Sequence, residues 1–176
     1  MKALIQTQKA LKSGLPRAFK LNNGQYIPSI GLGTVGLMNA DSITNAIMNA
    51  GYIYLDTASM YGNEKMVGEA IQNAFRQGKS RDDVFVITKV DQHEQNDIEK
   101  YLKLSLERLQ LDYVDIYLVH FPYNYYAPVP IPQYKVWGQM ENMVDAGLAK
   151  GIGISNYNAQ LIWDMMTYCK YKPVVN

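Results

Sequence analysis

Short apolar runs alternate along the chain with stretches in which apolar residues recur every three or four positions. The runs are rich in β-branched and aromatic residues, which predicts strands over 52–58, 83–90, 114–121 and 151–155 and the start of another at 173–176. The periodic stretches predict helices over 41–49, 65–75, 97–109, 135–146 and 159–168. Four prolines within residues 122–134 predict a loop there.

Strands that are apolar on both faces and separated by helices predict an α/β fold with a parallel sheet built from βα units. Two architectures fit this pattern, an open doubly wound sheet and a (β/α)8 barrel that is cut short. Gly31, Gly33 and Gly36 match the G-x-G-x-x-G pattern of dinucleotide-binding loops, and Asp56 follows at the expected distance. We do not favour such a loop, because Pro28 interrupts the segment before the glycines and the helical pattern starts only at Asp41.

Composition and charge narrow the functional classes. The 176 residues carry a formal net charge of +1, which gives no general attraction to nucleic acid or to an anionic membrane. No apolar run approaches the roughly 18 residues that cross a bilayer. Cys169 is the single cysteine, which excludes an internal disulfide and favours a reducing, cytoplasmic location.

The amino-terminal end differs from the rest, since no acidic residue precedes Asp41 while Lys2, Lys9, Lys12, Arg17 and Lys20 do. We interpret residues 1–18 as an N-terminal extension lying on the domain. An organellar targeting segment is the alternative interpretation, although the segment has few arginines and serines.

Residues capable of chemistry stand where the predicted strands finish. Carboxyl ends of parallel strands share one rim, where barrel enzymes build their active sites. Each of these side chains taken alone has a structural explanation, such as a helix cap or core packing, but their joint placement favours a functional site. The residues are Asp56, Lys89, His120, Ser155 and Asn156, with Tyr61 from the loop after Asp56.

This set suits proton donation to a carbonyl oxygen. The Lys89 ammonium would stabilise the phenolate that Tyr61 becomes after giving up its proton, and Asp56 would hold Lys89 in place. His120 would orient the substrate oxygen or assist proton transfer. No side chain supplies a hydride, which implies a reduced nicotinamide cofactor. We expect no metal site, because the other histidine, His93, lies in a polar loop, and no G-x-S-x-G elbow indicates a serine hydrolase.

From residue 19 to its end the chain resembles the aldo-keto reductases, (β/α)8-barrel enzymes that reduce aldehydes and ketones with NADPH. The resemblance implies an incomplete barrel over 19–176, with an N-terminal hairpin, about five βα units and the start of strand six. It also implies that GLGT (31–34) is the first barrel strand. The segments that carry it are FKLNNGQYIPSIGLGT (19–34), AGYIYLDTASMYGNEKMVGEAI (50–71), VFVITKV (84–90), LERLQLDYVDIYLVHFP (106–122), VWGQMENMVDAGLAKGIGISNYN (136–158) and PVVN (173–176).

The resemblance also implies roles for individual residues. The catalytic tetrad falls on Tyr61, Asp56, Lys89 and His120. Cofactor contacts fall on Thr34, Asp56, Ser155 and Asn156, and the last two would hold the nicotinamide carboxamide. Where the family often has an aromatic residue just after the strand-three lysine, this chain has Asp91, so a substrate preference cannot be transferred.

In the family, a further carboxamide ligand, a tyrosine that stacks on the nicotinamide and the basic loop for the adenosine 2′-phosphate follow the point that corresponds to Asn176. We therefore expect the 176-residue polypeptide to bind NADPH weakly. Two functions stay open, an NADPH-dependent carbonyl reductase and a truncated, non-catalytic barrel remnant with an interaction or structural role. A partner chain or self-association would cover the open edge of such an arc.

Overall fold

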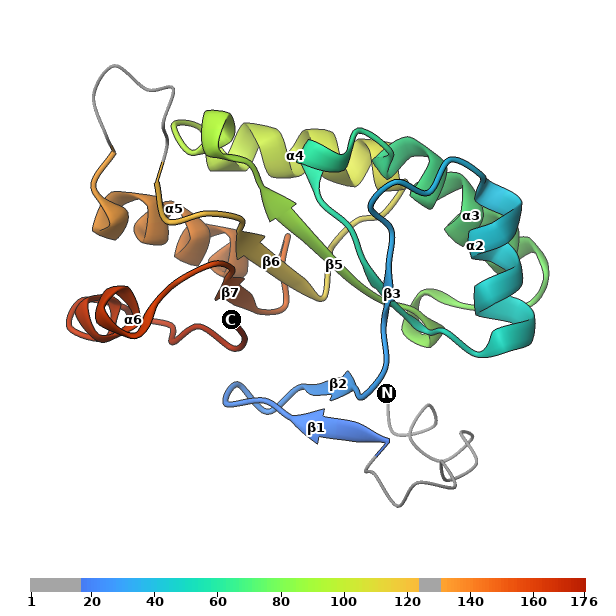
Figure 1. Ribbon diagram of the computed structural model, residues 1–176, viewed down its shortest axis with the longest axis horizontal. Coiled ribbons are helices and arrows are strands. Elements are labelled where there is room, and N and C mark those ends of the chain that lie inside the picture. Colours follow the sequence, from blue (N-terminus) through green and yellow to red (C-terminus); the bar gives the residue numbers. More distant parts are fainter. Residues whose placement is uncertain (1–16, 124–130) are drawn as a thin grey trace.

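The sheet at the centre of the fold has five parallel strands in the order β3-β4-β5-β6-β7. The computed structural model describes residues 17–123 and 131–176, so residues 1–16 of the expected N-terminal extension and part of the proline-rich loop lie outside the described residues. The strand order follows the chain order, as in consecutive βα units of a barrel (Figure 1). The strands are β3 (Leu32–Gly33), β4 (Tyr54–Asp56), β5 (Phe85–Val90), β6 (Ile116–Val119) and β7 (Ile152–Ile154).

The helices follow the strands and cover one side of the sheet (Figure 1). Asn39 caps the first of them, accepting hydrogen bonds from the backbone N–H groups of Asp41 and Ser42. Short helical turns flank the strands at η1 (Ala46–Ala50), η2 (Ser59–Tyr61), η3 (Arg81–Asp83) and η4 (Gln92–Glu94). The α-helices are α2 (Ala40–Asn45), α3 (Glu64–Arg76), α4 (Ile98–Leu109), α5 (Gln133–Asp145) and α6 (Ala159–Met165).

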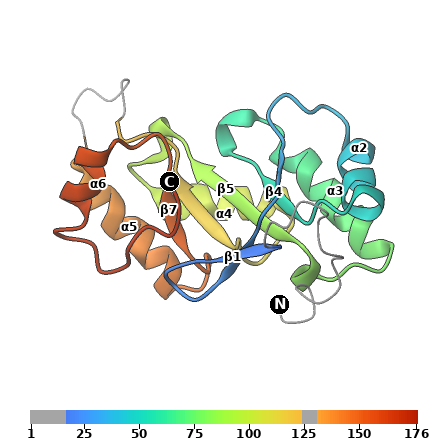
Figure 2. The same ribbon diagram turned by 60° about the horizontal axis from the view of Figure 1, so that its bottom comes forward.

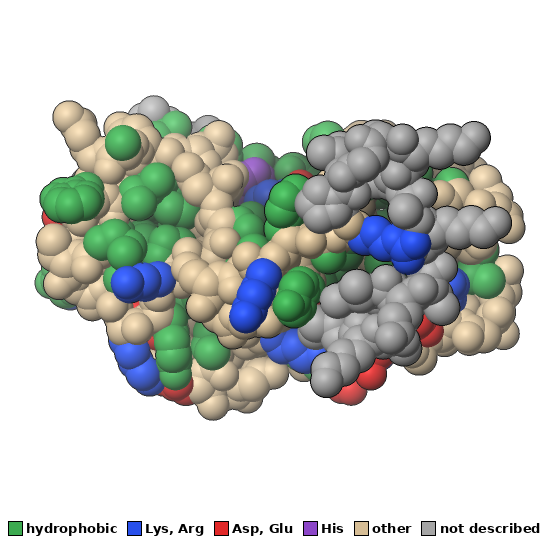
Figure 3. Space-filling model, turned by 90° about the horizontal axis from the view of Figure 1, so that it is seen from below, with side chains coloured by type: hydrophobic (Ala, Val, Ile, Leu, Met, Phe, Trp, Pro, Cys, Tyr) green, Lys and Arg blue, Asp and Glu red, His purple; other side chains and the backbone are tan. Residues whose placement is uncertain are grey.

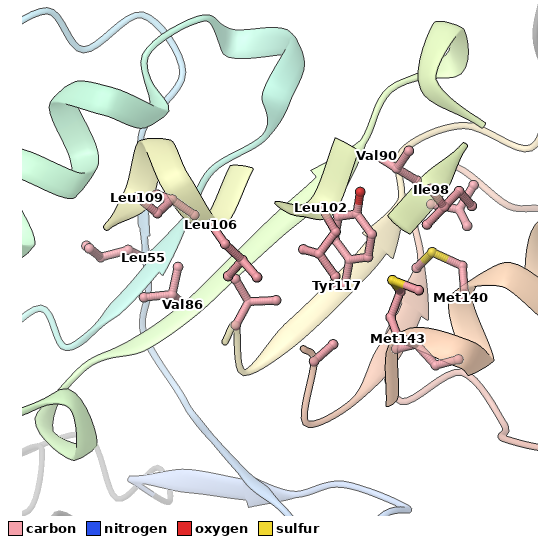
Figure 4. Packing of buried hydrophobic residues seen from close by; sticks show 14 of the residues in the cluster. Leu55, Val86, Val90, Ile98, Leu102, Leu106, Leu109, Tyr117, Met140 and Met143 are labelled. Carbon is pink, nitrogen blue, oxygen red and sulfur yellow. The ribbon is translucent and has the colours of Figure 1, made fainter. Parts of the chain in front are cut away.

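The main core lies between this helical layer and the outer face of the sheet. The periodic apolar side chains of α4 point at the strands, as the sequence predicts (Figure 4). Two methionines of α5 belong to the same core. The labelled contacts comprise Ile98, Leu102, Leu106 and Leu109 of α4, Leu55, Val86, Val90 and Tyr117 of the strands, and Met140 and Met143 of α5.

The inner face of the sheet carries a second, smaller cluster built from Phe85, Ile87, Ile116 and Leu118. A β-hairpin, β1 (Ala18–Lys20) and β2 (Tyr26–Pro28), packs against it through Leu21 and Ile27. Figure 2 shows the hairpin coming forward across the strands. The hairpin and the first strand over residues 31–34, both implied by the resemblance, are therefore present in the fold.

Several predicted boundaries need correction. No regular strand forms at 173–176 in the described structure, although Val174 donates to the Ile152 oxygen at 2.9 Å and Ile154 to the Val175 oxygen at 3.1 Å. Two hydrogen bonds align this segment with β7 without making a ladder. Helix α6 ends at Met165 rather than at residue 168, because tight turns take over after it. Helix α5 begins at Gln133, inside the predicted loop, directly after Pro132.

The glycine motif does not form a dinucleotide-binding loop. Gly33 lies within β3, and α2 begins only at Ala40, so no helix opens at the glycines. Gly31 has a packing role instead, since a Cβ there would lie 2.4 Å from the Tyr54 ring. None of the helices in the described residues is long and apolar enough to cross a membrane.

Candidate active site

The alternation of side chains along β5 determines which residue of this strand faces the candidate site. Phe85 and Ile87 belong to the inner cluster, whereas Val86 and Val90 belong to the outer core. Lys89 therefore continues the inward row, at the carboxyl end of the strand. Figure 3 views the molecule from below, where hydrophobic side chains gather on this face and a histidine and a lysine are visible between them.

The Lys89 ammonium joins three groups from the neighbouring β4 segment. Its Nζ donates to Asp56 Oδ1 at 2.6 Å, to the Thr57 backbone oxygen at 2.9 Å and to the Tyr61 hydroxyl at 3.0 Å. Lys89 is 5% exposed. A buried ammonium needs such acceptors, because burial of an unpaired charge is costly. The arrangement brings together three of the four residues predicted for proton transfer.

Tyr61 reaches Lys89 from η2, a single helical turn. The turn ends at Gly62, whose φ of +68° reverses the chain with little strain because glycine has no Cβ. The Lys89 Nζ also lies 4.8 Å from the centre of the Tyr61 ring. The phenol is therefore held by its hydroxyl and lies next to a positive charge.

His120, directly after β6, completes the predicted group of four. It is 6% exposed, and its ring centre lies 5.8 Å from that of Tyr61 in an edge-on arrangement. On its other side it stacks on Phe121 at 4.7 Å. Burial, followed by the positive charge of Lys89, lowers the pKa of His120, so the ring is neutral at neutral pH. Its Nδ1 has no hydrogen-bond partner among the described residues.

Ser155 and Asn156 lie at the end of β7, beside His120. Asn156 has a φ of +63°, a conformation that asparagine tolerates better than most residues. Its Nδ2 donates to the His120 backbone oxygen at 2.9 Å and to Ser155 Oγ at 3.1 Å. The amide nitrogen is thus engaged within the chain, and the Ser155 hydroxyl proton and the Asn156 carbonyl oxygen remain to meet a ligand.

Those two groups fit a carboxamide, since a hydroxyl can donate to its oxygen and a carbonyl can accept from its nitrogen. The donor set at this position therefore agrees with a nicotinamide ring held by Ser155 and Asn156. For metals, no group of three or more histidine, cysteine or acidic side chains in residues 17–123 and 131–176 could hold an ion.

Thr34 occupies a different environment from the other predicted cofactor residues. Its side chain is fully buried, and its hydroxyl and backbone N–H both donate to the Asp56 backbone oxygen, at 3.1 and 3.0 Å. Asn63 Nδ2 in turn donates to the Thr34 oxygen at 2.7 Å. These bonds fix the backbone that carries Asp56, and the cofactor contact of Thr34 stays a prediction.

Sequence reasoning missed a clamp that joins the Tyr61 turn to the end of β5. Ser59 Oγ lies 2.6 Å from Glu94 Oε2 and 3.1 Å from the Lys89 backbone oxygen. The same Glu94 oxygen accepts from the Asp91 backbone N–H at 2.8 Å. Glu94 gives no sequence signal for this role, because it stands in a polar turn with no periodic pattern.

Comparison with known proteins agrees with this geometry. Residues 29–176 match the model of the aldo/keto reductase family. Aldose reductase C of Dictyostelium discoideum is 38% identical over 185 residues, covering 90% of this chain and 57% of that protein.

Solved structures give the same result. The aldose reductase from Schistosoma japonicum superposes with a TM-score of 0.84 at 32% identity, over 90% of this chain and 59% of that one. An aldo-keto reductase of Bombyx mori in complex with NADP gives a TM-score of 0.81 at 34% identity, over 90% of this chain and 56% of that one. The chain spans a little more than half the length of these relatives. With the family model matched over most of its length, the chain belongs to the aldo/keto reductase family.

Proposed function

We propose that this chain carries the proton-transfer site of a reductase that converts aldehydes or ketones to alcohols with NADPH as the hydride donor. The observation that carries the proposal is the Lys89 ammonium, which contacts both the Asp56 carboxylate and the Tyr61 hydroxyl within 3.0 Å. Support for the cofactor comes from the carboxamide-compatible pair Ser155 and Asn156 and from the Bombyx mori relative, which was solved with NADP.

In the proposed reaction a hydride reaches the carbonyl carbon while Tyr61 donates its proton to the carbonyl oxygen. A reduced nicotinamide, when bound, supplies the hydride. Lys89 stabilises the negative charge left on the Tyr61 oxygen, and Asp56 keeps the ammonium in place. His120, neutral because burial lowers its pKa, offers a ring N–H that can hydrogen-bond the substrate oxygen without competing for the proton.

The same geometry supports this proposal over the alternative of a truncated, non-catalytic barrel remnant. His120 has a buried imidazole nitrogen without a hydrogen-bond partner among the described residues, and Lys89 donates to the hydroxyl of Tyr61. An active site explains why both stand on one rim.

The test is replacement of Tyr61 by Phe in the protein that contains this chain. We expect carbonyl reduction to fall by about 10²–10⁴-fold, because the variant lacks the proton donor. Cofactor binding, followed by nicotinamide fluorescence, should stay nearly unchanged.

Tyr26→Phe is the matched control, since Tyr26 is partly exposed on β2, among the hairpin residues away from the rim. It should keep wild-type turnover. Retained turnover in the Tyr61 variant would show that another group donates the proton, and absence of carbonyl reduction in the wild-type protein would overturn the proposed function.

A further inference from the structure

Asp91 is the next residue on the inward-facing row of β5 after Lys89. The alternation that places Phe85, Ile87 and Lys89 on one side brings residue 91 to the same side, since its backbone is extended, with φ −75° and ψ 163°. Its carboxylate acts electrostatically on His120, raising the pKa of that ring against the larger effect of burial. Asp91 therefore stands at the edge of the candidate site.

The charged side chains at the edge of the candidate site, around Lys89 and Asp91, do not all form ion pairs with one another. The Lys89 ammonium is already matched by Asp56, with 2.6 Å between Nζ and Oδ1. Asp91 accepts a hydrogen bond from the Gln92 backbone, and Glu94 accepts from Ser59 and from the Asp91 backbone. Neither carboxylate is ion-paired with a lysine or arginine in the described part of the chain. The Asp91 carboxylate, which caps η4, therefore keeps its negative charge at this edge without a lysine or arginine partner among the described residues.

His120 gives a second observation that supports a ligand at this place. The His120 side chain is more than nine-tenths buried, faces Tyr61, and has an Nδ1 without a partner among residues 17–123 and 131–176. A substrate held between Tyr61 and His120 would extend past Asp91, where a charge on the substrate meets the carboxylate in a partly buried setting. Coulomb interactions are much stronger there than in bulk water.

We propose that Asp91 is a specificity-determining residue that makes the site prefer carbonyl substrates bearing a positive charge and disfavour those bearing a carboxylate. This inference rests on the proposed function, because it describes the substrate of the same site.

The test compares three para-substituted benzaldehydes, with trimethylammonium, tert-butyl and carboxylate groups. The first two have nearly the same shape but differ in their electronic effect on the carbonyl, so the effect of the Asp91 charge is read from how each ratio of kcat/KM differs between the wild type and a variant without that charge. We expect the wild-type ratios, cationic over neutral and neutral over anionic, each to exceed those of the uncharged variant by about five- to tenfold. Added salt should reduce both ratios, since it screens a partly exposed carboxylate.

Asp91→Asn is the decisive variant, because asparagine can still accept the Gln92 hydrogen bond but has no charge. Both ratios should fall by that factor, since the electronic effect of each para group is the same in the two proteins. Asp112→Asn, which removes an exposed carboxylate before β6 at the opposite end of the strands, should leave them at the wild-type values.

Binding of the three aldehydes is measured separately from turnover, through the shift of the His120 ring resonances. Reduction of all three aldehydes with equal ratios in wild type and Asp91→Asn would overturn the specificity proposal and leave the proposed function standing. Charge-selective binding that Asp91→Asn abolishes, without any turnover, would support the selectivity and overturn the reductase function.

Discussion

At the scale of single residues, Lys89 determines the geometry of the site. Its ammonium meets three acceptors from one short segment, Asp56 to Tyr61, and each of them is within 3.0 Å. The sequence predicts Asp56 and Lys89 because they stand at strand ends, and Tyr61 because it lies in the loop just after Asp56. It does not predict the Thr57 carbonyl as the third acceptor, since a backbone oxygen carries no residue-type signal.

The titration of His120 gives a prediction at the same scale. Its pKa is lower in the folded chain than the value of about 6.5 for an unfolded histidine. Below that pH the unfolded chain takes up a proton that the folded chain does not yet bind, so the free energy of unfolding should fall as the pH drops from about 6.5 through the lowered pKa.

Urea unfolding at a series of pH values, with an NMR titration of the ring, checks this expectation. His120→Gln removes the ionisable group, so its unfolding free energy should depend less on pH over the same window. Equal pH dependence in both proteins would contradict the assignment.

At the scale of secondary structure, close helix packing explains a residue that propensity would disfavour. Gly68 lies in α3, where a Cβ would stand 2.4 Å from the Arg108 backbone oxygen and 2.7 Å from the Leu109 carbonyl carbon of α4. Glu64, at the start of α3, joins that helix to α4 by accepting from Ser105 and to β5 by accepting from Thr88. The two helices can approach only because residue 68 has no side chain.

Gly68→Ala is therefore expected to destabilise the protein by about 1–3 kcal/mol, because neither backbone can move away cheaply. Gly138→Ala is the matched control in α5, where nothing lies within 4 Å of the added Cβ. It should stabilise the protein by up to about 1 kcal/mol through helix propensity. Urea unfolding of both variants tests the pair, and a stabilised Gly68 variant would show that α3 and α4 are not held at this distance.

Secondary structure also shows which features the sequence patterns do not predict. The existence of each α-helix between Ala40 and Met165 follows from the apolar period, although the predicted helix over 41–49 continues as a π-helix from Ala46. The segment at 173–176 does not become a regular strand. Strand formation depends on hydrogen bonds from neighbours, and Val174 and Val175 make only two such bonds, both with β7. A pattern within one segment contains no information about those partners.

At the scale of the whole molecule, the described residues form an arc of a barrel that includes the rim we propose for proton transfer. Of the described residues, Ser155 and Asn156 are the ones that we assign to the nicotinamide end of a cofactor. By resemblance, the groups for the adenosine phosphates follow the position of Asn176. A polypeptide of residues 1–176 alone should therefore bind NADPH much more weakly than a complete barrel.

Titration with NADPH, followed by nicotinamide fluorescence, measures this affinity. Ser155→Ala is the informative variant, because removing the hydroxyl that would meet the carboxamide should weaken any remaining binding further. A micromolar dissociation constant for the monomeric polypeptide would show that the described residues are sufficient to hold the cofactor.

The sequence by itself determined the order of strands and helices, because apolar periodicity reflects burial within each segment, and it placed Asp56, Lys89 and His120 on one rim, because parallel strands end on the same side. Only the tertiary structure decided that Glu94 clamps the Tyr61 turn and that the Thr34 hydroxyl is buried against the Asp56 backbone oxygen. It also decided that Asp91 and Glu94 form no ion pair with a lysine or arginine of the described residues. These properties depend on distances between segments far apart in the chain, which no local pattern specifies.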